Sequence, residues 1–223
     1  MAISFDAATD GGAVTATSLT YSHTITGTNP FLMVGVLGAV SATSLITGIT
    51  YNGTALTFIS GEQLYLADRF GEGWYLKAPS TGANNVVVSA SSSSYISSVA
   101  SSYTGVHQTT PIDNSLETHV DIGRTCDNTI VSVADNCWHL GMGFTGSGLP
   151  AAGTGTTNRK LDAATHMMAI DNNGVITPAG SNNIQITTTL GAGTGIIICG
   201  ITIAPPATAS SSYSRMSLLG VGR

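Results

Sequence analysis

Charged side chains are scarce in this sequence of 223 residues: they make up 9% of it, and only seven are Lys or Arg. The formal net charge is −5. Proteins that bind nucleic acids meet the phosphates with clusters of basic residues, and the sequence has no such cluster. We therefore expect no nucleic-acid partner. Hydrophobic residues make up 42% of the chain, which argues against disorder and allows a substantial core.

Long apolar runs are also absent. No stretch approaches the roughly 18 apolar residues that a membrane span needs. The N-terminus, Met1-Ala-Ile-Ser-Phe-Asp6, lacks a basic segment followed by an apolar one, so no signal peptide is visible. We expect no membrane partner and synthesis in a cytoplasm.

Cysteine is limited to Cys126, Cys137 and Cys199. The number is odd and no pair has the C-x-x-C spacing, so the sequence predicts buried thiols and no disulfide framework.

Helical periodicity is missing as well. Apolar residues alternate or run in short blocks, and Gly, Asn, Pro or Asp interrupts them about every ten residues, which is typical of stacked antiparallel sheets. The 25 Ser and 31 Thr residues suit strand surfaces. We predict an all-β fold, an antiparallel β-sandwich of jelly-roll type over residues 1–204. The expected strands are 13–26, 30–40, 44–51, 54–60, 62–67, 72–78, 85–90, 95–104, 116–122, 128–134, 137–145, 164–170, 174–178, 183–190 and 195–204.

Two local patterns refine this prediction. Asn52-Gly53, between alternating residues 49–58, predicts a hairpin with a type I′ turn. Residues 84–89 followed by 98–105 resemble residues 182–187 followed by 195–202: each is an Asn-Asn turn, a strand, a Gly/Ser-rich connection and a more buried strand. A duplicated hairpin explains this similarity, and so does chance in a sequence of few residue types.

The composition changes after residue 204. Pro205-Pro206 ends strand pairing, and residues 207–213 read as a spacer. Apolar residues then return in a segment too short to form a core. We predict that residues 205–223 are an extended C-terminal arm that docks on a neighbouring subunit; the alternative is that they fold back onto their own domain. The expected contact residues are Tyr213, Arg215, Met216, Leu218, Leu219 and Val221.

No residue pattern predicts a catalytic, cofactor or metal site, and we expect no enzyme. The five histidines, 23, 107, 119, 139 and 166, lack the spacing of a metal site and are interpreted as strand or loop residues. Gly141-Met-Gly143-Phe-Thr-Gly146 matches a dinucleotide-binding pattern, but no helix can follow it, so we interpret it as a strand end and a loop. Asp171-Asn-Asn-Gly174 is interpreted as a turn.

One stretch has the composition of a ligand-binding loop. Asp68, Arg69, Phe70 and Trp74 combine aromatic rings with charged hydrogen-bonding groups, as a sugar-binding surface does. The alternative is that the aromatic residues pack into the core.

Three segments resemble a known module. They are Tyr51-Asn-Gly-Thr-Ala-Leu-Thr57, Trp74-Tyr-Leu-Lys-Ala-Pro79 continuing through Asn84-Asn85 to Ser89, and Ser102-Tyr-Thr-Gly105 continuing to Pro111. Together they cover about residues 45–113. Their order resembles a jelly-roll sandwich module of bacteriophage structural and tail-fibre-like proteins and of bacterial surface proteins. The resemblance implies a scaffold and carries over no catalytic residues.

This resemblance and the arm imply a non-enzymatic bacteriophage virion structural protein, a head decoration or minor capsid protein that forms a homo-oligomer. Its expected partners are copies of itself and other virion proteins of the capsid or tail, and its expected location is the virion after synthesis in the host cytoplasm. The alternative is a tail-associated module that binds a receptor or carbohydrate such as a host-surface glycan. A hydrolase is the third reading, which turnover of a cell-wall or capsular polysaccharide would support.

Overall fold

The computed structural model describes residues 1–39, 44–64, 69–120, 123–189 and 195–206. Within these ranges every regular element is a strand, and the paired strands are antiparallel, so the predicted antiparallel β-sandwich is confirmed. The strands are β1 (Ser4–Ile25), β2 (Phe31–Ala39), β3 (Ile46–Tyr51), β4 (Thr54–Ala55), β5 (Thr57–Leu64), β6 (Arg69–Lys77), β7 (Gly82–Thr104), β8 (Ile112–Val120), β9 (Thr125–Val131), β10 (Trp138–Thr145), β11 (Pro150–Ala152), β12 (Thr157–Asp162), β13 (Met167–Asp171), β14 (Ser181–Thr188) and β15 (Ile196–Ile203).

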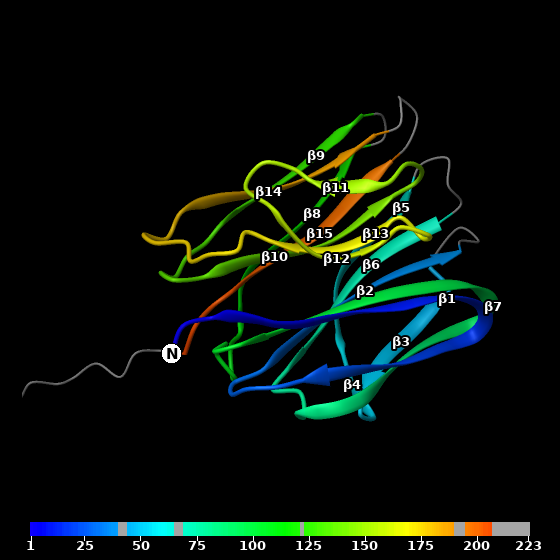
Figure 1. Ribbon diagram of the computed structural model, residues 1–223, viewed down its shortest axis with the longest axis horizontal. Helices are drawn as coiled ribbons and strands as arrows, with labels where there is room; N and C mark the ends of the chain where they lie inside the picture. Colours follow the sequence, from blue (N-terminus) through cyan, green and yellow to red (C-terminus); the bar gives the residue numbers. More distant parts are fainter. Residues whose placement is uncertain (40–43, 65–68, 121–122, 190–194, 207–223) are drawn as a thin grey trace, which may run out of the picture.

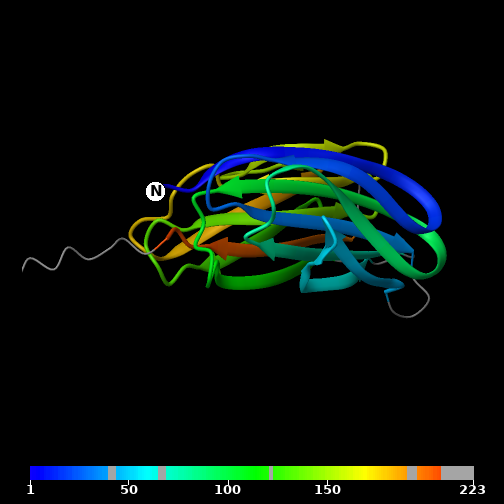
Figure 2. The same cartoon turned by 90° about the horizontal axis from the view of Figure 1, so that it is seen from below.

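The strands stack in four layers (Figure 1). Strands β9, β14 and β11 form one outer layer, and β8, β15, β10, β13 and β12 form the inner layer beneath it. The remaining sheet folds over to supply the other two layers, because β1 and β7 are long and each runs through both. Figure 2 shows β1 and β7 as one long paired ribbon that turns around the end of the molecule.

The sequence pattern of each strand follows from its layer. Inner strands β10 and β15 are buried on both faces, which explains why they read as nearly continuous apolar runs. Outer strand β9 alternates between exposed and buried positions, because only one of its faces meets the protein.

The chain consists of two halves with the same strand order. In residues 1–106 the inner layer runs in the order first part of β1, second part of β7, β2, β6, β5; the outer layer runs second part of β1, first part of β7, β3. In residues 107–206 the inner layer runs β8, β15, β10, β13, β12 and the outer layer β9, β14, β11. The similar segments noted in the sequence occupy equivalent places, in β7 and in β14 with β15.

Two aspartates mark this equivalence at the level of single residues. Asp6 and Asp113 each lie at a register shift near the start of the first inner strand of their half. Each carboxylate accepts a backbone N–H from the loop or strand end that precedes the next inner strand, at 2.9 Å and 2.7 Å respectively. Each also accepts a hydroxyl from the last strand of its half, that of Ser102 for Asp6 and that of Thr202 for Asp113. An aspartate thus stabilises the equivalent bulge in each half.

The two inner layers pack face to face and enclose the central core. One further core lies between each inner layer and its own outer layer, so there are three cores. Across the central core β2 faces β10, β1 faces β12, and β5 faces β8. Exchanging each strand for its equivalent in the other half turns the contact of β1 with β12 into that of β8 with β5, and leaves the contact of β2 with β10 unchanged. This is the pattern of an isologous packing with approximate two-fold symmetry.

Glycines allow the inner layers to approach closely. A Cβ atom on Gly73 would lie 2.8 Å from the Cβ of Cys199, and one on Gly71 would lie 2.8 Å from the ring of Phe144. Real Cβ atoms do not come this close to such neighbours, so a larger residue at either position would push the two halves apart.

The predicted strands differ from the observed ones in several places. The predicted strand 174–178 is wrong: apart from a single bridge between Ile176 and Cys137 the segment is irregular, because it forms the turn that Asp171 and Asn173 begin. The predicted breaks near residues 61 and 91–94 are wrong, since β5 continues through Gly61 and β7 continues through four serines. The start of β1 and strand β12 were not predicted, because their many polar residues gave no apolar alternation, and β11 was not predicted because it has only three residues.

Candidate functional site

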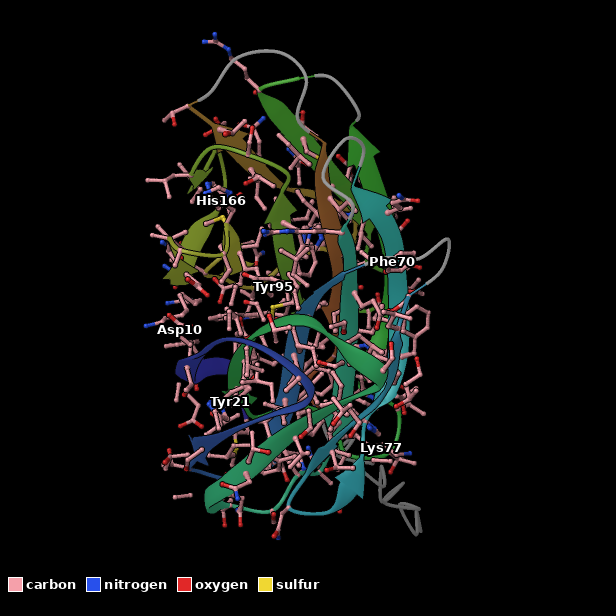
Figure 3. All side chains as sticks on the ribbon, turned by 90° about the vertical axis from the view of Figure 1, so that its right-hand side faces the viewer. Asp10, Tyr21, Phe70, Lys77, Tyr95 and His166 are labelled. Atoms are coloured by element: carbon pink, nitrogen blue, oxygen red, sulfur yellow. The ribbon has the colours of Figure 1, made fainter. Side chains whose placement is uncertain are left out.

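The predicted ligand loop lies largely on a strand. Arg69, Phe70 and Trp74 belong to β6, and Figure 3 shows Phe70 and Lys77 towards opposite ends of this strand; Asp68 lies outside the described residues. Side chains alternate along a strand, so Phe70 and Trp74 share one face and Arg69 is on the other. The Arg69 guanidinium lies 4.6 Å from the centre of the Tyr95 ring. The structure therefore brings Phe70 and Trp74 to one face and separates Arg69 from them.

Trp74 is held by its neighbours. Its indole Nε1–H donates a hydrogen bond to Glu72 Oε2 at 2.7 Å, and its ring packs edge-on against Phe58 at 5.2 Å. Trp74 also packs against the core beneath β2 and β6. Burial raises the pKa of Glu72, an effect that hydrogen bonds from Ser44 and Trp74 partly offset. Trp74 is half-buried, whereas its partner Phe58 is 47% exposed.

The predicted arm residues Tyr213, Arg215, Met216, Leu218, Leu219 and Val221 lie outside the described residues. The described chain ends at Pro206, just after β15. Ala204 and Pro205 line a surface hollow together with Ile112 and Val133. Val133 is 77% exposed. The start of the predicted arm therefore lies beside a hollow that is lined in part by apolar residues.

An open groove of about 220 Å³ lies close to this point, between the edge strands β5 and β8. Its walls combine isoleucine and aromatic side chains with the hydroxyl-bearing residues Thr57, Tyr75 and Ser115. The lining residues are Thr57, Phe58, Ile59, Tyr75, Ile112, Ser115 and Ile201. Ile112 lines both the groove and the hollow at the start of the arm. We call this feature the β5–β8 groove.

Two-fold symmetry places an equivalent site between β12 and β1, and there the groove is filled. The Arg159 guanidinium lies 4.4 Å from the centre of the Phe5 ring and its Nε lies 2.6 Å from Asp171 Oδ2. Asp171 is fully buried, and Tyr103 donates a hydrogen bond to the same oxygen at 3.0 Å. Asn173 Oδ1 accepts a second hydrogen bond from the guanidinium.

The strand registers show why one groove is open and the other closed. Both β5 and β12 contain a bulge against the next strand, at Ile59 in β5 and at Arg159 in β12. The same registers make Tyr75, which pairs with Thr57, the residue equivalent to Asp171, which pairs with Thr157. The β5–β8 groove thus has a short apolar residue where the closed site has a long cation, and no carboxylate to hold one. Its lining fits an uncharged occupant that contributes apolar side chains.

Buried histidines occur elsewhere in the structure. His139 is fully buried: Nε2 lies 2.8 Å from Asn128 Oδ1, and Nδ1 lies 3.1 Å from the side chain of Asn182. Asn128 uses its amide group to donate to Leu116 O, so its oxygen must accept from His139 Nε2–H. Burial lowers the pKa of His139 to about 4. It is thus a neutral residue that joins inner and outer layers.

His23 is equally buried and hydrogen-bonds to Thr9 through Nδ1 at 2.8 Å; burial lowers its pKa to about 4. His107 Nδ1 accepts backbone N–H groups of a turn, and His166 adopts a positive φ of 61° in a turn. The His119 side chain lies outside the described part. Among the described residues no three His, Cys, Asp or Glu side chains come together as a metal site would require.

The remaining motifs behave as the sequence indicates. The three cysteines are buried free thiols whose pKa burial raises to about 12. The glycine-rich segment 141–146 is the end of β10 and the following loop. Sequence reasoning missed Arg159 and the β5–β8 groove, because their partners are far apart in the sequence; only a recognised two-fold repeat would have indicated them.

Comparisons with protein-family models, with curated proteins and with solved structures gave no match to this chain. Within the described residues, no helix is long and apolar enough to cross a membrane.

Proposed function

We propose that the chain is a non-enzymatic structural protein of the bacteriophage virion, a head decoration or minor capsid protein that assembles as a homo-oligomer. Its place would be the virion, after synthesis in the host cytoplasm, and its partners would be copies of itself and other proteins of the capsid or tail. The resemblance of residues 45–113 to phage structural modules supports the class of protein.

The β5–β8 groove is the observation that carries this proposal. Isoleucine and aromatic side chains make up most of the lining of the groove, which lies on the surface between two sheets and adjoins the start of the predicted arm. Exposed apolar hollows of this kind are typical of sites for protein partners. Ile201 belongs to the central core, and Ile59, Tyr75 and Ile112 pack against it, so these wall residues are anchored before a partner binds.

We also propose a specific fold for each half of the chain. In each half the chain passes repeatedly between the inner and outer layer, apart from one hairpin that stays in the inner layer (β5–β6 in the first half, β12–β13 in the second), and the first and last strands pair. We interpret this connectivity as jelly-roll-like and propose that the chain is two such units fused in tandem. Jelly rolls are common in capsid proteins, which supports the proposed class.

Deletion of residues 207–223 tests the proposal. Phage particles would be purified from a host that makes either the intact chain or the deleted chain, and the copy number per particle would be measured by quantitative mass spectrometry. We expect many copies of the intact chain and loss of the deleted chain, while circular dichroism shows the same β-structure in both. Absence of the intact chain from the particles would reject the proposal; normal incorporation of the deleted chain would reject the role of the arm.

One observation favours the second candidate, a receptor- or carbohydrate-binding module of the phage tail. Phe58 is an exposed aromatic ring in the groove, and the hydroxyls of Thr57 and Ser115 are nearby. Sugar sites use such combinations. Glycan-array binding that is lost in both Phe58→Ala and Trp74→Ala, with folding unchanged, would favour this candidate over the first.

A further inference from the structure

The β5–β8 groove is one of two sites related by the internal two-fold symmetry, and it is the one without a plug. At the closed site Arg159 covers Phe5 and pairs with buried Asp171. At the open site Ile59 and Ile112 stand in the equivalent positions. A side chain from elsewhere could cover these isoleucines, and because the lining residues include no carboxylate we expect an uncharged side chain that makes apolar contacts.

The sequence beyond Pro206 supplies such side chains. Ser217 separates Met216 from Leu218, and Gly220 separates Leu219 from Val221. An extended segment of this kind presents two apolar residues to one side. Each of these side chains is large enough to fill part of a groove of about 220 Å³, and two together resemble the anchors of a peptide docked in a groove.

The length of the chain after Pro206 favours a groove on another copy. Ile201, a wall residue of the groove, precedes Pro205 by only four residues. A chain that turned back into its own groove would need a short reversal of a few residues. Instead, Pro205-Pro206 favours an extended exit, and nine residues, 207–215, separate the prolines from Met216. Fully extended, these nine residues span about 30 Å, enough to reach a neighbour.

We propose that the β5–β8 groove of one copy is the acceptor for the segment Met216–Val221 of a second copy. The proposal rests on the proposed function, since it names the partner of the groove in the homo-oligomer. The contact joins two different surfaces, arm and groove, so a ring of copies or a reciprocal pair closes it.

Cysteine cross-linking between two full-length populations tests the proposal. One population carries Ser115→Cys in the groove wall, the other carries Leu218→Cys in the arm and a different affinity tag. The native thiols are buried and have pKa values raised to about 12, so they do not compete. After mixing and oxidation with diamide, we expect a disulfide-linked pair that contains both tags. The matched control is Thr20→Cys, an exposed strand residue outside the groove, which should give no such pair.

The double variant Ser115→Cys with Leu218→Cys shows whether the arm in a groove belongs to the same chain or to another copy. We expect linked multimers; a disulfide within a single chain at high dilution would overturn the proposal in favour of folding back. Absence of any link involving Ser115→Cys would overturn the groove as acceptor. If the intact chain is nevertheless found in particles, the proposed function survives this failure.

A blocking variant provides a second measurement. Ser115→Arg places a long cation over the groove, and we expect it to raise the concentration at half-assembly by about 30-fold, the loss of one hot-spot anchor. Thr20→Arg makes the same change of charge on an exposed strand and should leave assembly unchanged. An equal effect of both variants, or of neither, would overturn the proposal.

Discussion

The Tyr103 hydroxyl donates a hydrogen bond of 3.0 Å to the fully buried carboxylate of Asp171, and this contact joins the two halves of the chain. Tyr103 belongs to β7 and Asp171 to β13, 68 residues apart. Burial, together with the charge of Asp171, raises the pKa of Tyr103 well above its usual value, so the phenol stays protonated and remains the donor. Arg159 neutralises the carboxylate from the other side.

Removing the charge of Asp171 should weaken the junction between the halves. Asp171→Asn leaves the Arg159 side chain, which is 15% exposed, without its ion-pair partner. We expect a loss of about 3 kcal/mol in the free energy of unfolding, measured by urea denaturation. Tyr103→Phe removes only the hydrogen bond to a charged group and should cost about 2 kcal/mol.

A double-mutant cycle of these two variants checks the shared network. Because both residues act on the same oxygen, Tyr103→Phe should cost less in the Asp171→Asn background than in the natural chain. Strictly additive losses would contradict the network.

The close approach of the inner layers gives a second prediction. Gly73→Ala would place a Cβ atom 2.8 Å from that of Cys199, between two sheets that cannot separate without opening the core. We expect a loss of about 1–3 kcal/mol in the free energy of unfolding. Gly48→Ala is the matched control, because a Cβ there meets no atom within 4 Å and its φ is not positive. It should cause no loss, since alanine is favoured over glycine in strands; equal losses in the two variants would show that the close packing is not the cause.

The two buried histidines make stability depend on pH. Burial lowers the pKa of His23 and of His139 to about 4, below the value of about 6.5 expected in the unfolded chain. Below pH 6.5 the unfolded state therefore binds protons that the folded state does not, and the free energy of unfolding falls as the pH falls. Between pH 7 and 5 the fall should be about 2 kcal/mol for each histidine.

Denaturation of the double variant His23→Gln with His139→Gln at pH 7, 6 and 5 isolates this effect. The variant should be less stable at pH 7, because Gln replaces the ring contacts of His139 with Asn128 and Asn182. Its stability should decline less over this range than that of the natural chain. An unchanged decline would assign the pH dependence to other groups.

The equivalence of Asp6 and Asp113 predicts equal roles. Each carboxylate fixes a bulge by accepting a backbone N–H and a hydroxyl. Asp6→Ala and Asp113→Ala should each lower the free energy of unfolding by about 1–3 kcal/mol, because each removes a carboxylate that accepts several hydrogen bonds. A large loss in one and none in the other, measured by urea denaturation, would show that the two bulges are not equivalent.

Local features were predictable from the sequence, and long-range ones were not. The hairpin at Asn52-Gly53 is confirmed: Tyr51 pairs with Thr54, and both turn residues have positive φ, 48° and 75°. Turn chemistry is local, so two residues suffice to indicate it. The runs of β2, β10 and β15 were found because strands buried on both faces are continuously apolar.

The candidate site shows the limit of such reasoning. Arg159 looked like an ordinary polar residue, because the ring of Phe5 that it covers is 154 positions earlier in the chain. The groove arises only where β5 from one half meets β8 from the other. The ligand loop was predicted from composition, but alternation along β6 places Arg69 on the opposite face from Phe70 and Trp74.

The mass of the purified full-length chain in solution, measured by light scattering after size-exclusion chromatography, tests the central claim that this protein works by associating with copies of itself. The claim predicts an integral multiple, two or more, of the chain mass of 22.6 kDa at micromolar concentration. A constant mass of 22.6 kDa at every concentration would contradict it.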